Sequence, residues 1–291
     1  MNLMKTEWKK IWYGKTIVHM LLICLSVSLF CMLLMSMAKS NSSFFCIMQA
    51  YYEAGQKKPG IMSADTYLSP ENSIGYILGL NDWSKPEGFE IYRSAMFPTF
   101  IFMLIFLITI SSLYAKEYSL LMFRQAIFCG VGKFRVFISK FVVNFIFYGL
   151  LYLANIAGVY VIFSIYAGYI PSGKEIIMLL TAILLNILNF AVFESMAVLL
   201  VGHTKNSIVG IVVNILWFFS SFMIYPMVHK DFWGYGKIIG VIAALSPGTY
   251  LYKICSGLVT KEVILNNSVY VTFMLLLLWT GIMLKLRKQE V

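Results

Sequence analysis

The chain has 291 residues, of which 60% are hydrophobic and only 12% charged, and its formal net charge is +10. This composition excludes a water-soluble globular domain, because too few polar groups are present to cover its surface. The apolar residues are concentrated in six stretches, each of about the length that crosses a bilayer as a helix. We therefore predict a polytopic membrane protein.

The chain begins with a short amphipathic segment, residues 1–15. At helical spacing Met4, Trp8, Ile11 and Trp12 fall on one face, and charged side chains fill the remainder. This pattern predicts a helix that lies on the membrane surface with its two tryptophans at the level of the lipid headgroups. An alternative left open is that these residues are only the charged start of the first span.

The six apolar stretches predict an all-α membrane protein, a six-transmembrane-helix bundle. Helices and closed barrels are the structures that satisfy every backbone polar group in lipid, and uninterrupted runs exclude the alternating pattern of a barrel. The first run is longer than the apolar core of a signal peptide, so we expect it to be retained. The predicted spans are 16–38, 95–113, 141–166, 176–201, 207–228 and 268–284.

Charge gives the orientation of these spans. If both termini are cytosolic, the inner segments hold 13 Lys and Arg against three acids, whereas the outer segments hold 10 against nine in about twice the length. The positive-inside rule therefore predicts that both termini lie in the cytosol. Positive loops beside anionic headgroups account for the basic charge, so we expect membrane lipids as partners and no nucleic acid.

Two outer segments are long enough to have structure of their own. Residues 39–94 predict a small subdomain with short helices near 44–52 and 74–80. Residues 229–267 contain two apolar pieces, each too short to span, with a Ser-Pro-Gly break at 246–248, which predicts a re-entrant hairpin. Whether Cys46 and Cys255, one in each segment, are bridged is left open.

The chain shows no signature of catalysis. Gly14-Lys15-Thr16 is similar to the end of a phosphate-binding loop, but Lys9 stands where that loop needs its first glycine. The three histidines lie in different segments, so their spacing builds neither a metal cluster nor a catalytic triad. We expect no catalytic, cofactor or metal site in this chain.

The most specific pattern lies in the cytosolic segment 114–140. It predicts a short interfacial helix over 117–128, a break at Gly130 and Gly132, and a second basic helix that runs into the third span. A basic loop that adheres to lipid headgroups is the alternative. The residues that stand out are Glu117, Tyr118, Arg124, Gly132, Lys133, Arg135 and Lys140.

This segment, with the N-terminal surface helix, the six spans and the outer hairpin, resembles the permease subunits of type-2 ABC exporters. The resemblance implies that the segment is a coupling helix, which fits a cleft on a separate ATP-binding subunit. It also implies two such ATPase subunits, which bind ATP and Mg, and a second permease subunit, identical or different. The ATPase-coupling residues would be Glu117, Tyr118, Arg124, Lys133 and Arg135.

The resemblance further implies a function: the permease subunit of an ATP-driven exporter in a bacterial plasma membrane. The long outer segment 39–94 resembles the subset linked to bacteriocin or lantibiotic self-protection and peptide export. We therefore expect an amphipathic cargo, such as an antimicrobial peptide, a lipid-linked molecule or a drug. The sequence does not specify the cargo or the direction of transport.

Polar residues inside the predicted spans are candidates for a transport pathway or for helix packing. Glu194 is the one acid in these spans, and such a group is expected to face a partner, a cavity or the interface. Gating, packing against the N-terminal helix, and proton relay in a secondary carrier remain open for it. The small residues Ala154 and Gly158 predict close helix approach. The candidates are Asn144, Tyr148, Tyr152, Asn155, Asn186, Asn189 and Glu194.

Overall fold

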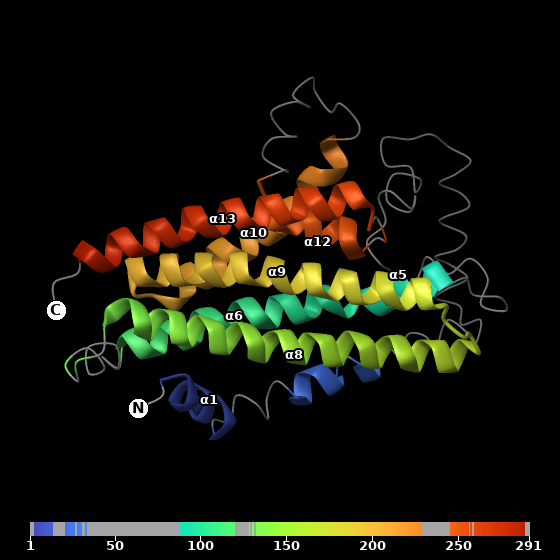
Figure 1. Cartoon of the computed structure of the whole chain (residues 1–291), viewed down its shortest axis with the longest axis horizontal. Helices are drawn as coiled ribbons and strands as arrows, with labels where there is room; N and C mark the ends of the chain where they lie inside the picture. The colour runs from blue at the N-terminus through green and yellow to red at the C-terminus, as the bar shows by residue number, and fades with distance from the viewer. Residues whose placement is uncertain are drawn as a thin grey trace.

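The computed structural model describes residues 3–13, 21–26, 28–30, 33, 88–119, 128, 130, 132–228, 245–255, 257 and 259–288. These residues are almost entirely helical and include no β-strand. Figure 1 shows the long helices side by side in one bundle. The predicted short helices at 44–52 and 74–80 lie outside the described residues.

Four helices are long and apolar enough to cross a membrane. They are α6 (Pro98–Ser119), α8 (Lys133–Ala167), α9 (Gly173–Thr204) and α13 (Lys261–Lys288). Shorter apolar helices, Leu21–Phe30 and Ser207–Phe219, lie in the two remaining predicted spans, and the latter belongs to α10 (Ser207–Val228). The chain is an all-helical, multi-pass membrane protein, and four of the six predicted spans reach spanning length within the described residues.

Helix α9 is at the centre of the bundle. It packs against α6, α8, α10 and α13, and near one end also against the short helices α5 (Gly88–Met96) and α12 (Pro247–Cys255). Its inward side chains are consequently among the most buried of the chain, including the polar residues Asn186, Asn189 and Glu194. Any polar group on this face must find its partners on neighbouring helices.

The helix ends differ from the predicted boundaries. Helix α6 continues through Glu117 and Tyr118, which we had assigned to a separate interfacial helix. Helix α13 begins at Lys261, inside the predicted hairpin, because Thr260 accepts a hydrogen bond from the Val263 N–H at 3.3 Å. The predicted Ser-Pro-Gly break is the start of α12, with Pro247 in the first helical position, where its missing N–H costs nothing.

Short turns join α8 to α9 and α9 to α10. Helix α8 ends at Gly168, whose φ of 66° is left-handed, and α9 then begins with a capping box between Ser172 and Glu175. At its other end α9 stops at Lys205, which also adopts a left-handed φ of 54°. These local signals fix α8, α9 and α10 as successive antiparallel neighbours.

The two ends of the bundle differ in composition. One end gathers helix α1 (Leu3–Tyr13), the C-terminal ends of α6 and α13, the start of α8 and the α9–α10 turn (Figure 1). We call it the basic end, because these segments are rich in Lys and Arg. Helices α5 and α12 and the α8–α9 turn lie at the opposite end.

Candidate functional site

A buried ion pair joins α6 to α8 at the basic end. Glu117, in the last turn of α6, pairs with the ammonium group of Lys140 in α8. The Lys140 side chain is only 2% exposed, and its Nζ lies 4.7 Å from the centre of the Tyr114 ring. A buried ammonium needs such a partner, since an unpaired charge away from water costs several kcal/mol.

The N-terminal helix α1 is attached to the same ion pair. Lys10 of α1 lies 2.6 Å from Glu7 and 3.9 Å from Glu117, so Glu117 faces cations from two helices. Ile11 is buried, and the Trp8 ring packs edge-on against Phe147 of α8 at 6.4 Å. Helix α1 therefore packs on α8 through apolar contacts and reaches α6 through a charged one.

Glu194 lies deeper in the bundle, where α6, α8 and α9 meet. Its side chain is fully buried, and its Oε1 accepts hydrogen bonds from the Tyr114 hydroxyl at 2.9 Å and from Asn144 Nδ2 at 3.2 Å. The second oxygen, Oε2, is buried and has no hydrogen-bond partner among the described residues. The expected packing of Glu194 against the N-terminal helix is wrong: its hydrogen bonds go to α6 and α8.

Tyr114 connects the two charged sites. Its hydroxyl group donates to Glu194, and the face of its ring lies under the Lys140 ammonium. A continuous chain of polar contacts thus runs from Lys10 through Glu117, Lys140 and Tyr114 to Glu194. We call these five residues the basic-end network. Because it joins α1, α6, α8 and α9, displacement of one helix is resisted or followed by the other three.

The residues expected to contact an ATPase fall into three groups. Glu117 and Tyr118 turn inward, and the Tyr118 ring lies 6.2 Å from that of Phe137 in α8. Arg135 is exposed near the start of α8, and Lys133 is the first residue of that helix. Arg124 lies outside the described residues. Of the five, Glu117 and Tyr118 are committed to contacts within the bundle.

The break predicted between the two basic helices has a clear local cause. Gly130 has a φ of 81°, which a residue with a Cβ rarely adopts, and Gly132 precedes the first turn of α8. From Lys133 onward the helix is continuous into the third span.

The predicted polar stripe of α8 faces neighbouring helices along its whole length. Asn144 bonds Glu194, the Tyr148 ring packs edge-on against Phe106 of α6 at 5.1 Å, and Asn155 Nδ2 donates to the Cys24 carbonyl at 3.2 Å. Tyr152 is fully buried and joins a second polar cluster. These contacts connect helices, which is the packing interpretation of the stripe.

The second cluster lies nearer the opposite end. The Tyr152 hydroxyl is 2.8 Å from Thr99 Oγ1 of α6 and accepts from Asn186 Nδ2 of α9 at 2.8 Å. Asn186 Nδ2 also lies 3.6 Å from Cys255 Sγ of α12, which is a buried free thiol. The predicted partner Cys46 is outside the described residues. Asn189 instead donates to the Leu185 carbonyl of its own helix.

One packing prediction is wrong within the described residues. Ala154 and Gly158 are exposed, and a Cβ placed on Gly158 would meet nothing within 4 Å. The close approach that this pair predicted is therefore not made by any described helix. The small residues lie on a face of α8 turned away from α6 and α9.

Sequence reasoning missed the importance of Lys140 and Tyr114. The available signal was a lysine placed between apolar residues on both sides, as in Phe137, Ile138 and Phe141, where a charge needs a partner. Tyr114 gave no signal, because a tyrosine at the end of a span is equally typical of the membrane interface.

Comparison with known proteins gives one match. The family model described as ABC-2 family transporter protein matches residues 72–221, slightly more than half of the 291 residues. The matched region runs from before α5 into α10, and it contains four of the five residues of the basic-end network. No curated protein and no solved structure matches the chain.

Proposed function

The chain belongs to the ABC-2 transporter family, and from this premise we propose that it is the permease subunit of an ATP-driven exporter in a bacterial plasma membrane. Permeases of this family are membrane transport components that are not themselves catalytic, and they generally work with an ATP-binding subunit. The family match over residues 72–221 is the observation that carries the proposal.

In the proposed assembly two permease subunits, identical or different, meet two ATPase subunits, which bind ATP and Mg. The cargo is amphipathic: an antimicrobial peptide, a lipid-linked molecule or a drug. The length of the outer segment 39–94 supports the peptide-export subset, because it resembles that of permeases in bacteriocin self-protection. The basic end faces the cytosol, in agreement with the positive-inside rule.

The basic-end network supports a mechanism for transmitting force. The segment between α6 and α8 is the proposed contact for the ATPase, and the Glu117–Lys140 pair joins the two helix ends that flank it. A push on this segment would therefore move α6 and α8 together. Lys10 would carry the displacement to α1, and Tyr114 would carry it to Glu194 in the central helix.

Purification from native membranes tests the proposal. The chain should retain a soluble ATPase whose hydrolysis depends on the complex, and the chain alone should bind no ATP. Arg124→Glu, in the proposed contact, should weaken this association, because a reversed interfacial charge costs affinity. The matched control is Lys174→Glu, an exposed lysine at the opposite end, which should leave association unchanged. Full ATPase stimulation and full export by Arg124→Glu would contradict the coupling assignment.

A proton-coupled carrier that uses Glu194 is the second candidate. The observation in its favour is the buried Oε2 atom, which has no hydrogen-bond partner in the described part of the chain. Neither cavity described in the bundle is lined by Glu194, so the hydrogen bonds to Tyr114 and Asn144 favour a structural joint. Glu194→Gln should therefore keep ATP-dependent export, reduced only in proportion to lost stability. Flux driven by a pH gradient without ATP, abolished by Glu194→Gln, would establish the carrier.

A further inference from the structure

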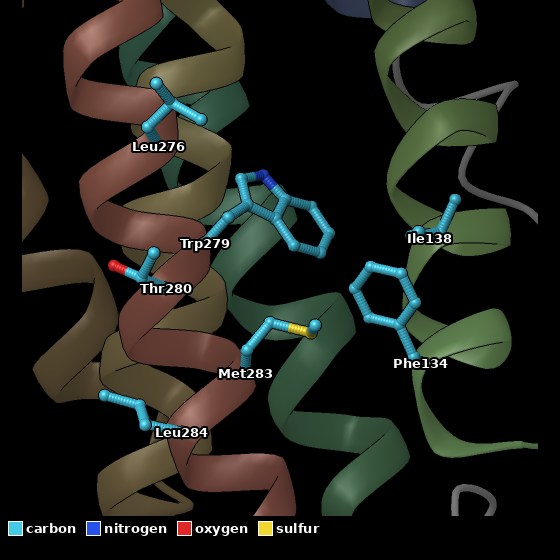
Figure 2. Close-up of a pocket in the computed structure, with 7 residues that line it drawn as sticks. All are labelled: Phe134, Ile138, Leu276, Trp279, Thr280, Met283 and Leu284. Atoms are coloured by element: carbon cyan, nitrogen blue, oxygen red, sulfur yellow. The ribbon is translucent and has the colours of Figure 1, made fainter.

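An apolar groove opens between α8 and α13 near the basic end. Its volume is about 690 Å³, within the range of about 300–1,000 Å³ typical of small-molecule sites. Figure 2 shows Trp279 and Met283 of α13 pointing toward Phe134 and Ile138 of α8 across the gap. Ile138, Trp279 and Met283 are half-buried, whereas Leu276, Leu284 and Phe134 are exposed at its rim.

Aromatic contacts hold the two helices at a fixed separation around this groove. The Trp279 ring lies edge-on to Phe134 at 6.1 Å and to Phe141 at 5.1 Å, so one indole bridges α13 to two successive turns of α8. Because these contacts lie along one side of the groove, they keep it from collapsing. An open apolar groove of this size in a membrane helix bundle needs an apolar occupant.

The mouth of the groove is positively charged. On α8 Phe134 stands between Lys133 and Arg135, and on α13 Leu284 is followed by Lys285, with Arg287 and Lys288 after it. Lys285 lies within electrostatic range of Lys205, a second cation. Arg135 is exposed, and no described acid forms an ion pair with Arg135, Lys205 or Lys285.

We propose that this groove binds one acyl chain of an anionic phospholipid, whose phosphate group is held at the mouth by Arg135 and Lys285. The apolar walls accept the chain, and the unpaired cations favour a negative headgroup, worth about 1 kcal/mol or fivefold in affinity per cation. A second copy of this chain is a poorer occupant, since a membrane dimer with aligned ends would bring its own basic end against these cations. The inference depends on residence in a membrane and on no particular cargo.

Quenching of Trp279 fluorescence tests the proposal directly. The full chain is reconstituted in vesicles that contain phosphatidylglycerol or phosphatidylcholine with brominated acyl chains, since bromine quenches indole only on contact. The signal of Trp279 is the difference between the parent protein and its Trp279→Phe variant. Brominated phosphatidylglycerol should quench this signal at a lower mole fraction than brominated phosphatidylcholine.

Two variants separate the headgroup from the acyl chain. Arg135→Gln with Lys285→Gln should reduce the preference for phosphatidylglycerol by about fivefold for each cation removed. The matched control, Lys174→Gln at the opposite end, should leave it unchanged. Ile138→Phe, which fills the groove, should reduce quenching by both lipids. Each variant is compared with its own Trp279→Phe counterpart.

Three results would overturn the proposal. Equal quenching by the two lipids in the parent protein would remove the selectivity, and this comparison needs no folded charge variant. An unchanged preference in the double variant would remove the role of Arg135 and Lys285. Absent quenching together with disulfide cross-linking between copies through Thr280→Cys, at an exposed residue of the groove, would show that a second copy covers it.

Discussion

The ion pair between Glu117 and Lys140 should respond asymmetrically to loss of either partner. Glu117→Gln leaves the Lys140 ammonium buried, with the Tyr114 ring as its remaining printed contact, and Lys140 is only 2% exposed. Breaking a buried pair from this side costs about 3–5 kcal/mol. We therefore expect Glu117→Gln to lower the free energy of unfolding by an amount in that range.

Loss of the lysine should cost less. In Lys140→Met the Glu117 carboxylate retains Lys10 at 3.9 Å and is 13% exposed, so water reaches it. A partly satisfied group of this kind costs about 1–3 kcal/mol. The double variant should be less destabilised than the sum of the two single variants, because removing both charges leaves neither one buried alone.

Equilibrium unfolding in mixed micelles, followed by circular dichroism, measures these differences. Glu262→Gln and Lys174→Met, exposed residues away from the basic end, are matched controls and should change stability by about 0.5 kcal/mol or less. The reasoning is refuted if Lys140→Met costs as much as Glu117→Gln, or if the double variant shows the full sum.

Three other predictions concern topology, a helix cap and a thiol. Maleimide should label Lys174→Cys from outside intact cells and His203→Cys only after permeabilisation, since these exposed residues lie at opposite ends of α9; the reverse pattern would invert the orientation. Ser172→Ala should lower thermal stability by about 1 kcal/mol through loss of the capping box with Glu175, whereas Ser172→Asn should not. Burial raises the pKa of the Cys255 thiol to about 12, so it stays protonated and unlabelled between pH 7 and 9, while Lys174→Cys labels faster as pH rises. Labelling of native Cys255 that increases over this range would contradict its burial.

The sequence predicts the helices better than their ends. Runs of apolar residues identify α8 and α9 directly, because nothing but a helix satisfies their backbone in lipid. The end of α6 could not be predicted, since Glu117 reads as the start of a surface helix unless Lys140 is known to lie beside it. Charged residues extend a buried helix when a neighbour supplies the counter-charge, and that depends on packing.

The candidate site could be predicted in part for the same reason. Glu194 stands out as an acid in an apolar span, but its partners Tyr114 and Asn144 are 80 and 50 positions away in the chain. Choosing them requires the rotation and register of three helices, which side-chain periodicity alone does not fix. Asn144 was identified because the polar stripe of α8 repeats at helical spacing, whereas Tyr114 belongs to no such repeat.

Helix α8 is longer than the membrane is thick. At about 1.5 Å per residue its 35 residues extend roughly 52 Å, against a hydrocarbon core of about 30 Å. The 27 residues beyond Lys140 span about 40 Å, so each degree of tilt about that point moves the far end by about 0.7 Å. That far end packs on α5, next to the turn into α9. An angular change of a few degrees at the ion pair therefore becomes a translation of several ångströms on the other side of the bilayer.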